Sequence, residues 1–160
     1  MIETKYPTTP AIRVLKDQDV AFTIHSYKYE EHGGTPVAAR ELGVPEHEVI
    51  KTLVFETEAR EPLLVLMHGD KEVSTKTLAR ILGVKTVTPC TPETANKHTG
   101  YQVGGISPFG TRKRLKVHMQ KSIADLPKIY INAGKRGLLA EISPAEVMRL
   151  LNPVLVDAAA

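Results

Sequence analysis

The 160-residue sequence contains a single cysteine, Cys90, and therefore cannot form an internal disulfide. Proteins without disulfides are typical of reducing compartments, so we expect a cytoplasmic protein. No stretch approaches the roughly 18 consecutive apolar residues that a membrane-spanning helix requires. Residues 1–7 lack the basic and apolar regions of a secretory signal. We therefore expect a soluble protein that has no contact with a membrane.

The sequence also lacks the usual motifs of metal sites and hydrolases. Its six histidines include no close pair at ligand spacing, so we expect neither a metal ion nor another cofactor; a site built from distant histidines stays open. Cys90 lies in a loop between Pro89 and Pro92, which favours a small half-buried side chain over an activated nucleophile. Ser107 is followed by proline rather than by the glycine of a Gly-x-Ser-x-Gly elbow, which argues against a serine hydrolase.

Length and composition predict one globular domain spanning residues 1–160. A chain of this length can bury a single core without cross-links, and its contents of 42% hydrophobic and 24% charged residues are ordinary. The net charge of +3 permits a polyanionic partner but falls short of the dense basic surface that holds long nucleic acid. The local concentration of cations at residues 112–116 is consistent either with steering of phosphates or with a solvated surface.

Several local patterns predict where helices begin and end. A hydroxyl residue before a proline offers a capping oxygen and a preset φ angle at the first helical position. Residues 39–44 and 79–84 share the pattern of a helix ended by a glycine. The four predicted helix starts are Thr9-Pro10, Thr35-Pro36, Thr91-Pro92 and Ser143-Pro144, the last with Glu146 placed for a capping box.

Alternating apolar residues and turn residues predict the strands. We expect them at residues 22–27, 49–55, 63–67, 115–119, 129–131 and 138–142, with a short helix near residues 122–126. The short turns at residues 58–62 and 134–137 predict antiparallel pairing within a mixed sheet. We expect disordered tails at residues 1–7 and 158–160.

Lys51 is the most informative single residue, because it interrupts the apolar strand predicted at residues 49–55. Its ammonium group either reaches water from an edge strand, or is paired, or faces a cavity in which an anionic ligand supplies the partner. Two glycine-rich segments, at residues 100–110 and 134–137, have backbone amides that can approach a ligand closely, although ordinary tight turns share this composition. Together these features predict a small-substrate site built around Lys51.

At these same residues the sequence resembles the YbaK/EbsC family of aminoacyl-tRNA deacylases, which are relatives of the editing insertion of bacterial prolyl-tRNA synthetases. The resemblance runs nearly end to end. It implies a single domain of the α/β (α+β) class, with a mixed, mostly antiparallel, barrel-like sheet flanked by helices and a crevice for the 3′ end of a mischarged tRNA. The matching segments are Thr9–Ala11, His25–Tyr27, Val49–Leu53, Thr99–Pro108 and Gly134–Leu138.

The resemblance also implies roles for individual residues. Lys51 matches the family's essential lysine and would hold the terminal adenosine or its phosphate. Backbone donors of Gly104, Gly105, Ile106 and Ser107 would lie near the ester oxygen. In the branch that removes cysteine from proline tRNA, the thiol of the substrate attacks its own ester and leaves as a thiolactone, so no protein nucleophile is required. The remaining residues expected to bind substrate are Tyr27, Thr52, Asn132, Gly134, Lys135, Arg136 and Gly137.

Three departures from the cysteine-specific branch bear on amino-acid selection. Gly33 and Gly34 stand where an aromatic residue is expected, Asn132 replaces a serine, and Leu139 replaces an aspartate. The leading hypothesis is a trans-acting deacylase for cysteine on proline tRNA. The alternatives are removal of alanine or serine by water, and a noncatalytic module that binds tRNA or a synthetase. The expected partners are the acceptor end of aminoacyl-tRNA and prolyl-tRNA synthetase.

Overall fold

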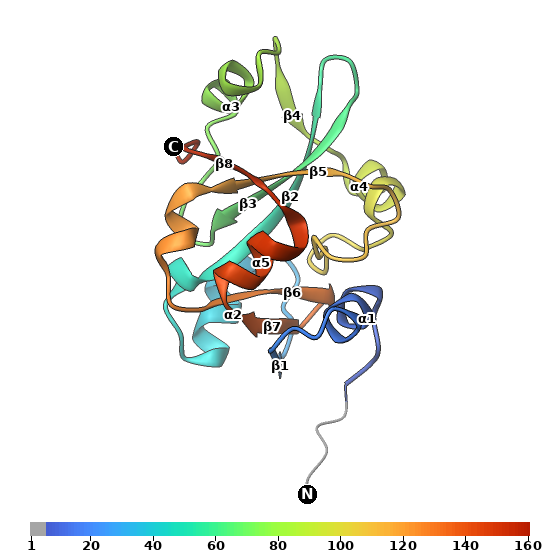
Figure 1. Ribbon diagram of the computed structural model, residues 1–160, viewed down its shortest axis with the longest axis vertical. Coiled ribbons are helices and arrows are strands. Elements are labelled where there is room, and N and C mark those ends of the chain that lie inside the picture. The colour runs from blue at the N-terminus through green and yellow to red at the C-terminus, as the bar shows by residue number, and fades with distance from the viewer. Residues whose placement is uncertain (1–5) are drawn as a thin grey trace, which may run out of the picture.

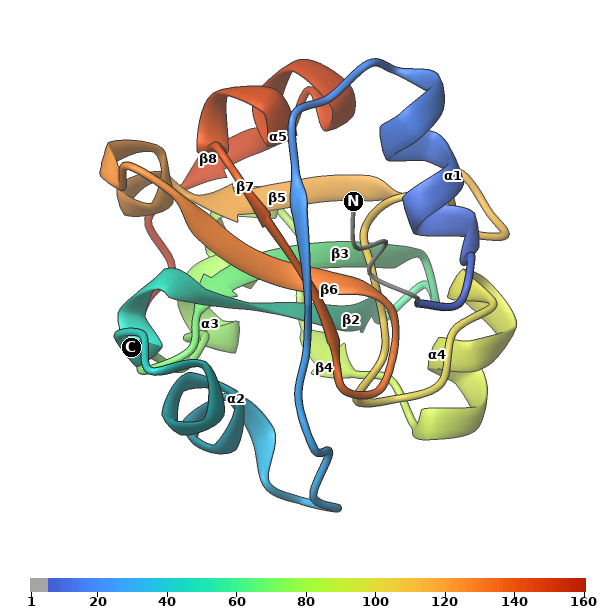
Figure 2. The same ribbon diagram turned by 90° about the horizontal axis from the view of Figure 1, so that it is seen from below.

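The computed structural model describes residues 6–160, and these residues form five α-helices and eight strands (Figures 1 and 2). Within the same residues, no helix is long and apolar enough to cross a membrane. The elements are, in chain order, α1 (Pro10–Asp17), β1 (Thr23–Ser26), α2 (Gly34–Leu42), β2 (Val49–Thr57), β3 (Pro62–His68), α3 (Thr75–Leu82), β4 (Val87–Pro89), α4 (Pro92–Thr99), β5 (Lys116–Gln120), β6 (Ile129–Lys135), β7 (Leu138–Ile142), α5 (Pro144–Leu151) and β8 (Val154–Val156). Short 3-10 helices lie at Glu46–Glu48 and Lys121–Asp125.

All eight strands belong to one mixed sheet. Its order is β1-β7-β6-β2-β3-β5-β8, and β4 pairs with a further stretch of β2. The pairs β1–β7, β6–β7, β2–β3 and β2–β4 are antiparallel, whereas β2–β6, β3–β5 and β5–β8 are parallel. The mixed, mostly antiparallel sheet of the sequence prediction is therefore confirmed. The end strands β1 and β8 are not paired with each other, so the sheet is open and not a closed barrel.

The helices lie around this sheet and leave the middle of β2 between α2 and α4 (Figure 2). A large core cluster joins α1 and α5 to the sheet, and Leu64, Leu66, Met119 and Ile131 in it are completely buried. The strand β2 lies inside the sheet, but β6 pairs with it only at Val49 and Ile50, so Lys51 has a neighbouring strand on the β3 side alone.

Side-chain caps confirm three of the four predicted helix starts. In each case the hydroxyl oxygen accepts a hydrogen bond from the backbone N–H three residues later, which satisfies one of the unpaired donors of the first turn. The three capping residues are Thr9, Thr91 and Ser143. The glycines predicted to end α2 and α3 also do so, in left-handed conformations, at Gly43 and Gly83.

The cap predicted at Thr35 is wrong. Helix α2 begins two residues earlier than predicted, and its N-cap position is Gly33, which has no capping side chain. The Thr35 hydroxyl lies 2.8 Å from the Glu46 carboxylate and 3.1 Å from the Gly69 carbonyl. The hydroxyl therefore connects α2 to the segments before β2 and after β3, and it does not cap the helix.

The expectation of a disordered carboxyl-terminal tail at residues 158–160 is also wrong. Ala158 is completely buried, Ala159 forms a bridge with Val73, and the Ala160 N–H donates to the Glu72 carbonyl at 2.8 Å. The tail therefore pairs with the segment between β3 and α3. The short strands β4 and β8 were also missed in the sequence, since each has only three residues. Most of the amino-terminal tail lies outside the described residues.

Candidate functional site

The site begins with a gap in the sheet beside β2. On one edge β2 is paired with β3 from residue 50 to residue 56. On the opposite edge β6 pairs only with Val49 and Ile50, and β4 pairs only with Phe55–Thr57. Residues 51–54 therefore have no neighbouring strand on that edge.

The strand register shows that the backbone N–H and C=O groups of Thr52 point into this gap. On the β3 edge, the Val49 carbonyl accepts from Gly69 and the Thr57 N–H donates to Glu61. Because peptide groups of an antiparallel pair alternate in direction, odd-numbered residues face β3 and even-numbered residues face the other edge. The Thr52 side-chain oxygen is buried and has no hydrogen-bond partner among the described residues. Such unpaired polar groups mark a place where a ligand can bind.

A cavity of about 770 Å³ opens beside this gap. Its volume lies within the usual range for small-molecule sites, about 300 to 1,000 Å³. The cavity draws its lining from the whole middle of β2, from the segment that leads into α2, from the segment before α3, from the start of α4, and from the two glycine-rich segments.

Lys51 lies in the cavity wall, with its side chain 18% exposed. The ammonium nitrogen is 3.3 Å from Oε1 of Glu72, whose own side chain is 85% exposed. An exposed ion pair of this kind contributes little to stability, at most about 1 kcal/mol. The Glu72 carboxylate therefore balances the charge of Lys51 in the free protein, and a ligand can displace this contact at little cost in free energy.

The two glycine-rich segments meet on another wall of the cavity. The Arg136 Nε–H donates to the Val103 carbonyl at 2.9 Å, and its guanidinium group lies over the ring of Tyr29, 5.0 Å from the ring centre. The Asn132 amide donates to the Gly104 carbonyl at 3.1 Å. The two segments are thus fixed against each other by side chains of β6 and of the turn that follows it.

The structure brings about half of the predicted site residues together. Those that do not line the cavity are Gly105, Ser107, Gly134, Lys135 and Gly137. Those that line it are Lys51, Tyr27, Thr52, Gly104, Ile106, Asn132 and Arg136.

The residues away from the cavity have packing roles. The Gly105 N–H donates to the Gln102 carbonyl within its own turn, and it is therefore not free for a substrate oxygen. The side chain of Ser107 is completely buried and accepts from the Phe109 N–H. The Gly137 carbonyl accepts from the Tyr27 N–H, which fixes one wall of the cavity from behind.

An apolar end of the cavity is formed by Val54, Cys90, Ala95 and Ile106. Burial and the nearby Glu56 carboxylate raise the pKa of the Cys90 thiol to about 11. Only a minute fraction of this thiol is ionised at neutral pH, so Cys90 is a poor nucleophile. This agrees with the sequence prediction of an unreactive side chain.

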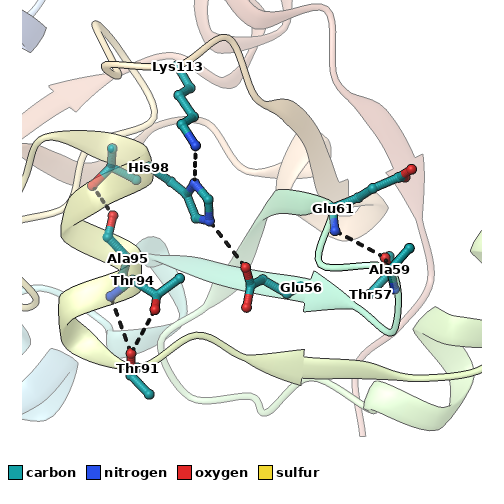
Figure 3. Close-up of polar contacts among 10 residues, drawn as sticks. Glu56, Thr57, Ala59, Glu61, Thr91, Thr94, Ala95, His98 and Lys113 are labelled. Carbon is teal, nitrogen blue, oxygen red and sulfur yellow. Dashed lines mark hydrogen bonds and ion pairs between the residues drawn. The ribbon is translucent and has the colours of Figure 1, made fainter.

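A chain of polar contacts lies behind this end (Figure 3). The Lys113 ammonium donates to Nδ1 of His98 at 3.0 Å, and His98 Nε2 lies 3.2 Å from a carboxylate oxygen of Glu56. A donor at Nδ1 places the ring proton on Nε2, where it points at Glu56. One cation of the basic stretch at residues 112–116 therefore stabilises the packing of α4 against β2.

The fold also assembles two groups of potential metal ligands that are distant in sequence. Within the described residues they are His47 with His68 and Asp70, and Glu56 with Cys90 and His98. In the first group the two imidazole rings are stacked, with centres 3.7 Å apart, and both nitrogens of His68 are hydrogen-bonded. In the second group the contact with Lys113 leaves a proton on the nitrogen that a metal would need. Both groups therefore act as hydrogen-bond networks.

Sequence reasoning did not find Glu72, Tyr29 or Cys90 as cavity residues. Glu72 and Tyr29 stand in polar segments without a distinctive pattern. The β2–β3 hairpin brings Glu72 to Lys51, and the pairing of β1 with the distant strand β7 brings Tyr29 to Arg136. The interruption of an apolar run, which identified Lys51, had no counterpart at these positions.

Comparison with known proteins supports a common origin. A family model described as an aminoacyl-tRNA editing domain matches residues 31–150. A candidate Cys-tRNA(Pro)/Cys-tRNA(Cys) deacylase of Enterococcus faecalis, EbsC, is 28% identical over 145 residues, which cover 90% of this chain and 88% of that protein. A proline–tRNA ligase of Brachyspira hyodysenteriae is 30% identical over 86 residues, which cover 54% of this chain but only 15% of the ligase.

The fold is also found among solved structures. The crystal structure of a candidate trans-editing enzyme for prolyl-tRNA synthetase superposes with a TM-score of 0.83. The match covers 97% of this chain and 99% of the other, at 20% sequence identity. At this level of identity the likeness shows a shared fold.

Proposed function

Because the chain belongs to the aminoacyl-tRNA editing domain family, we propose that it is a trans-acting deacylase that removes a wrongly attached amino acid from the 3′ end of tRNA. The observation that carries this proposal is the position of the Lys51 ammonium in a cavity beside the open edge of β2. A cation next to free backbone groups suits a ligand that combines phosphate, ribose and ester oxygens. We take residues 1–160 to act as one editing domain in the cytoplasm.

Cysteine on proline tRNA is the leading substrate. Its thiol sulfur would attack the ester carbonyl carbon, the bond to the ribose oxygen would break, and the thiol proton would pass to that oxygen. The products are tRNA and a cyclic thiolactone, and the cavity needs to supply only position and charge. The high pKa of Cys90 supports such a substrate-assisted reaction, since the cysteine in the cavity wall is not a competent nucleophile. Correct placement of an internal nucleophile lowers a barrier by at most about 7 to 11 kcal/mol.

Alanine or serine removal by water is the second candidate. It is favoured by the location of Gly34, Asn132 and Leu139, which depart from the cysteine-specific pattern and all line the cavity. Different side chains on the wall of a pocket alter which amino acid fits, and they leave the binding of the nucleotide unchanged. The partner we propose in either case is the acceptor end of aminoacyl-tRNA, with prolyl-tRNA synthetase as the enzyme whose errors are corrected.

The direct test is to incubate the purified protein with tRNA charged separately with cysteine, alanine, serine or proline, and to follow loss of each ester. We expect the cysteinyl ester to be lost fastest and the prolyl ester to survive. Faster loss of the alanyl or seryl ester would replace the thiolactone mechanism by water attack. No acceleration on any ester would refute the enzyme.

Substitution of Lys51 separates an enzyme from a noncatalytic module. We expect Lys51→Ala to reduce deacylation by about 100-fold or more, because a positioned cation is lost from the reacting region. Loss of the ion pair should change the free energy of unfolding in urea by less than about 1 kcal/mol, because its Glu72 partner is exposed. Lys121→Ala, which removes a surface lysine paired with Asp157, is the matched control and should retain full activity. Retained deacylation in Lys51→Ala would show that this lysine has no part in the reaction.

A further inference from the structure

Two carboxylates line the cavity among the described residues, Glu31 and Glu72, and they differ in their contacts. Glu72 is the one that reaches Lys51, through Oε1 at 3.3 Å. Its second oxygen, Oε2, makes no hydrogen bond or ion pair within residues 6–160. The cavity therefore presents a cation and an anion side by side, and the anion has a free acceptor.

The position of Glu72 is fixed by the backbone around it. Its carbonyl accepts from Ala160 at 2.8 Å, and the Ser74 N–H donates to the Ala158 carbonyl at 2.7 Å. Val73 bridges to Ala159 between these two bonds. The carboxylate is thus exposed, but it extends from a segment that is tied down on both sides of Val73.

The nearby acidic groups do not offer the same chemistry. Glu56 lies behind the apolar end of the cavity, where His98 already contacts its carboxylate. Glu31 makes no ion pair with a cavity cation. Of these carboxylates, Glu72 is therefore the one that contacts Lys51.

We propose that Glu72 binds the free α-ammonium group of the aminoacyl ester while Lys51 binds the oxygen-rich side of the same ester. This inference rests on the proposed function and adds a substrate class to it, namely aminoacyl esters with an unblocked amine. A single carbon separates the ammonium group from the ester carbonyl in such a substrate, so one adjacent pair of opposite charges can contact both. The Oε2 atom provides the acceptor, and charge-assisted hydrogen bonds are the stronger kind.

The pair also gives a physical reason to reject esters whose amine is acylated. An amide nitrogen has no positive charge, and its acyl group would have to be accommodated beside Glu72. An N-acylated ester would therefore lose the charge-assisted contact with the Glu72 carboxylate and gain nothing in its place. The site would therefore act on aminoacyl esters and spare N-acylated ones.

The test compares free and N-acetylated alanyl, seryl and cysteinyl esters of tRNA in wild-type protein and in Glu72→Gln. The glutamine has nearly the same shape but no charge, and at this exposed position the substitution leaves the packing of the fold unchanged. We expect wild-type protein to favour the free amine by about 5-fold in kcat/KM, the scale of an ion pair with an exposed carboxylate, and Glu72→Gln to bring the two substrates to within about 2-fold of each other. Glu72→Asp should recover part of the preference, and Glu31→Gln should leave the preference intact.

A binding measurement keeps the proposal separate from the proposed activity. Amide-linked aminoacyl-adenosine, which cannot be hydrolysed, is titrated with its amine free or acetylated. We expect the free amine to bind more tightly to wild-type protein, and the difference to vanish in Glu72→Gln. Equal binding of both forms to wild-type protein, or an unchanged difference in Glu72→Gln, would overturn the role of Glu72 whether or not deacylation occurs. Failure of deacylation with an intact binding preference would instead refute the proposed function alone.

Discussion

The Cys90 thiol lines the cavity and is still chemically unreactive. Burial is the larger cause of its raised pKa, and the neighbouring Glu56 carboxylate adds to the effect. Both favour the neutral thiol over the thiolate. An unreactive thiol suits a site in which the substrate is proposed to provide the nucleophile, because a reactive cysteine of the protein could attack the ester of the substrate.

We predict slow alkylation of Cys90. A shift from the ordinary thiol value of 9.0 to about 11 lowers the thiolate fraction at pH 8 by roughly 100-fold, so iodoacetamide should react about that much more slowly than with a free thiol in a peptide. Glu56→Gln should accelerate the reaction several-fold but not restore the peptide rate, because burial remains. Mass spectrometry of the alkylated protein against time provides the measurement. A rate equal to that of the peptide would contradict the environment assigned to Cys90.

At the scale of elements, the loop at residues 100–110 packs closely against the turn after β6, and this contact shapes one wall of the cavity. A β-carbon on Gly105 would lie 2.7 Å from the Arg136 backbone nitrogen and 2.9 Å from the Lys135 carbonyl carbon. These are backbone atoms that cannot move aside cheaply. The close approach places Gly104 and Ile106 on the cavity wall.

Gly105→Ala should therefore damage stability and activity together. We expect the two segments to separate, with a loss of stability of about 1 to 3 kcal/mol and a fall in deacylation of at least 10-fold. The matched control is Gly83→Ala, at a φ of +71° with open space around the new β-carbon. That control should lose about 1 kcal/mol through backbone strain alone and keep its activity. Urea unfolding and ester loss measure the two quantities. Normal activity in Gly105→Ala would mean that the approach of the two segments does not shape the site.

The elements also show which features a sequence can predict. The hairpins β2–β3 and β6–β7 are joined by short turns, so their antiparallel pairing follows from local chemistry. The parallel pairs β2–β6, β3–β5 and β5–β8 join strands far apart along the chain, and no local pattern indicates them. The gap beside β2 depends on the parallel β2–β6 pair and on the short antiparallel β2–β4 pair, because it exists where β6 stops and β4 begins. Lys51 could thus be identified from the sequence, whereas the open edge beside it could not.

On the scale of the whole molecule, the cavity is a product of distant segments. The Lys51 and Glu72 pair forms because β3 returns beside β2, and the backbone of Glu72 is fixed by the last three residues of the chain. The alanines at residues 158–160 have a composition typical of a frayed end, and their pairing depends on backbone partners at residues 72–74, 84 to 88 residues away. This is why the sequence indicated the cation of the site but neither its counter-ion nor the support behind it.

The size and charge of the molecule also limit how much tRNA it can contact. In the proposed function, a cavity of about 770 Å³ takes only the terminal nucleoside with its amino acid, and a net charge of +3 falls short of the dense charge that holds long nucleic acid. A contact with two or three phosphates of a single-stranded end predicts a modest salt dependence, with affinity falling about 10-fold between 50 and 200 mM salt. If the protein contacted six or more phosphates, its affinity would instead fall about 1,000-fold between 50 and 200 mM salt.

We therefore predict that a charged minihelix, which contains only the acceptor stem and the 3′ end, is deacylated with a kcat/KM within about 10-fold of the full tRNA. The reason is that the binding contacts expected at Lys51 and Arg136 all involve the terminal nucleotides. Parallel assays with both substrates at 50 and 200 mM salt measure the two effects together, and an uncharged minihelix added as competitor reports on the stem alone. An inert minihelix, or a 1,000-fold salt effect, would show that the protein binds a second region of tRNA beyond the cavity.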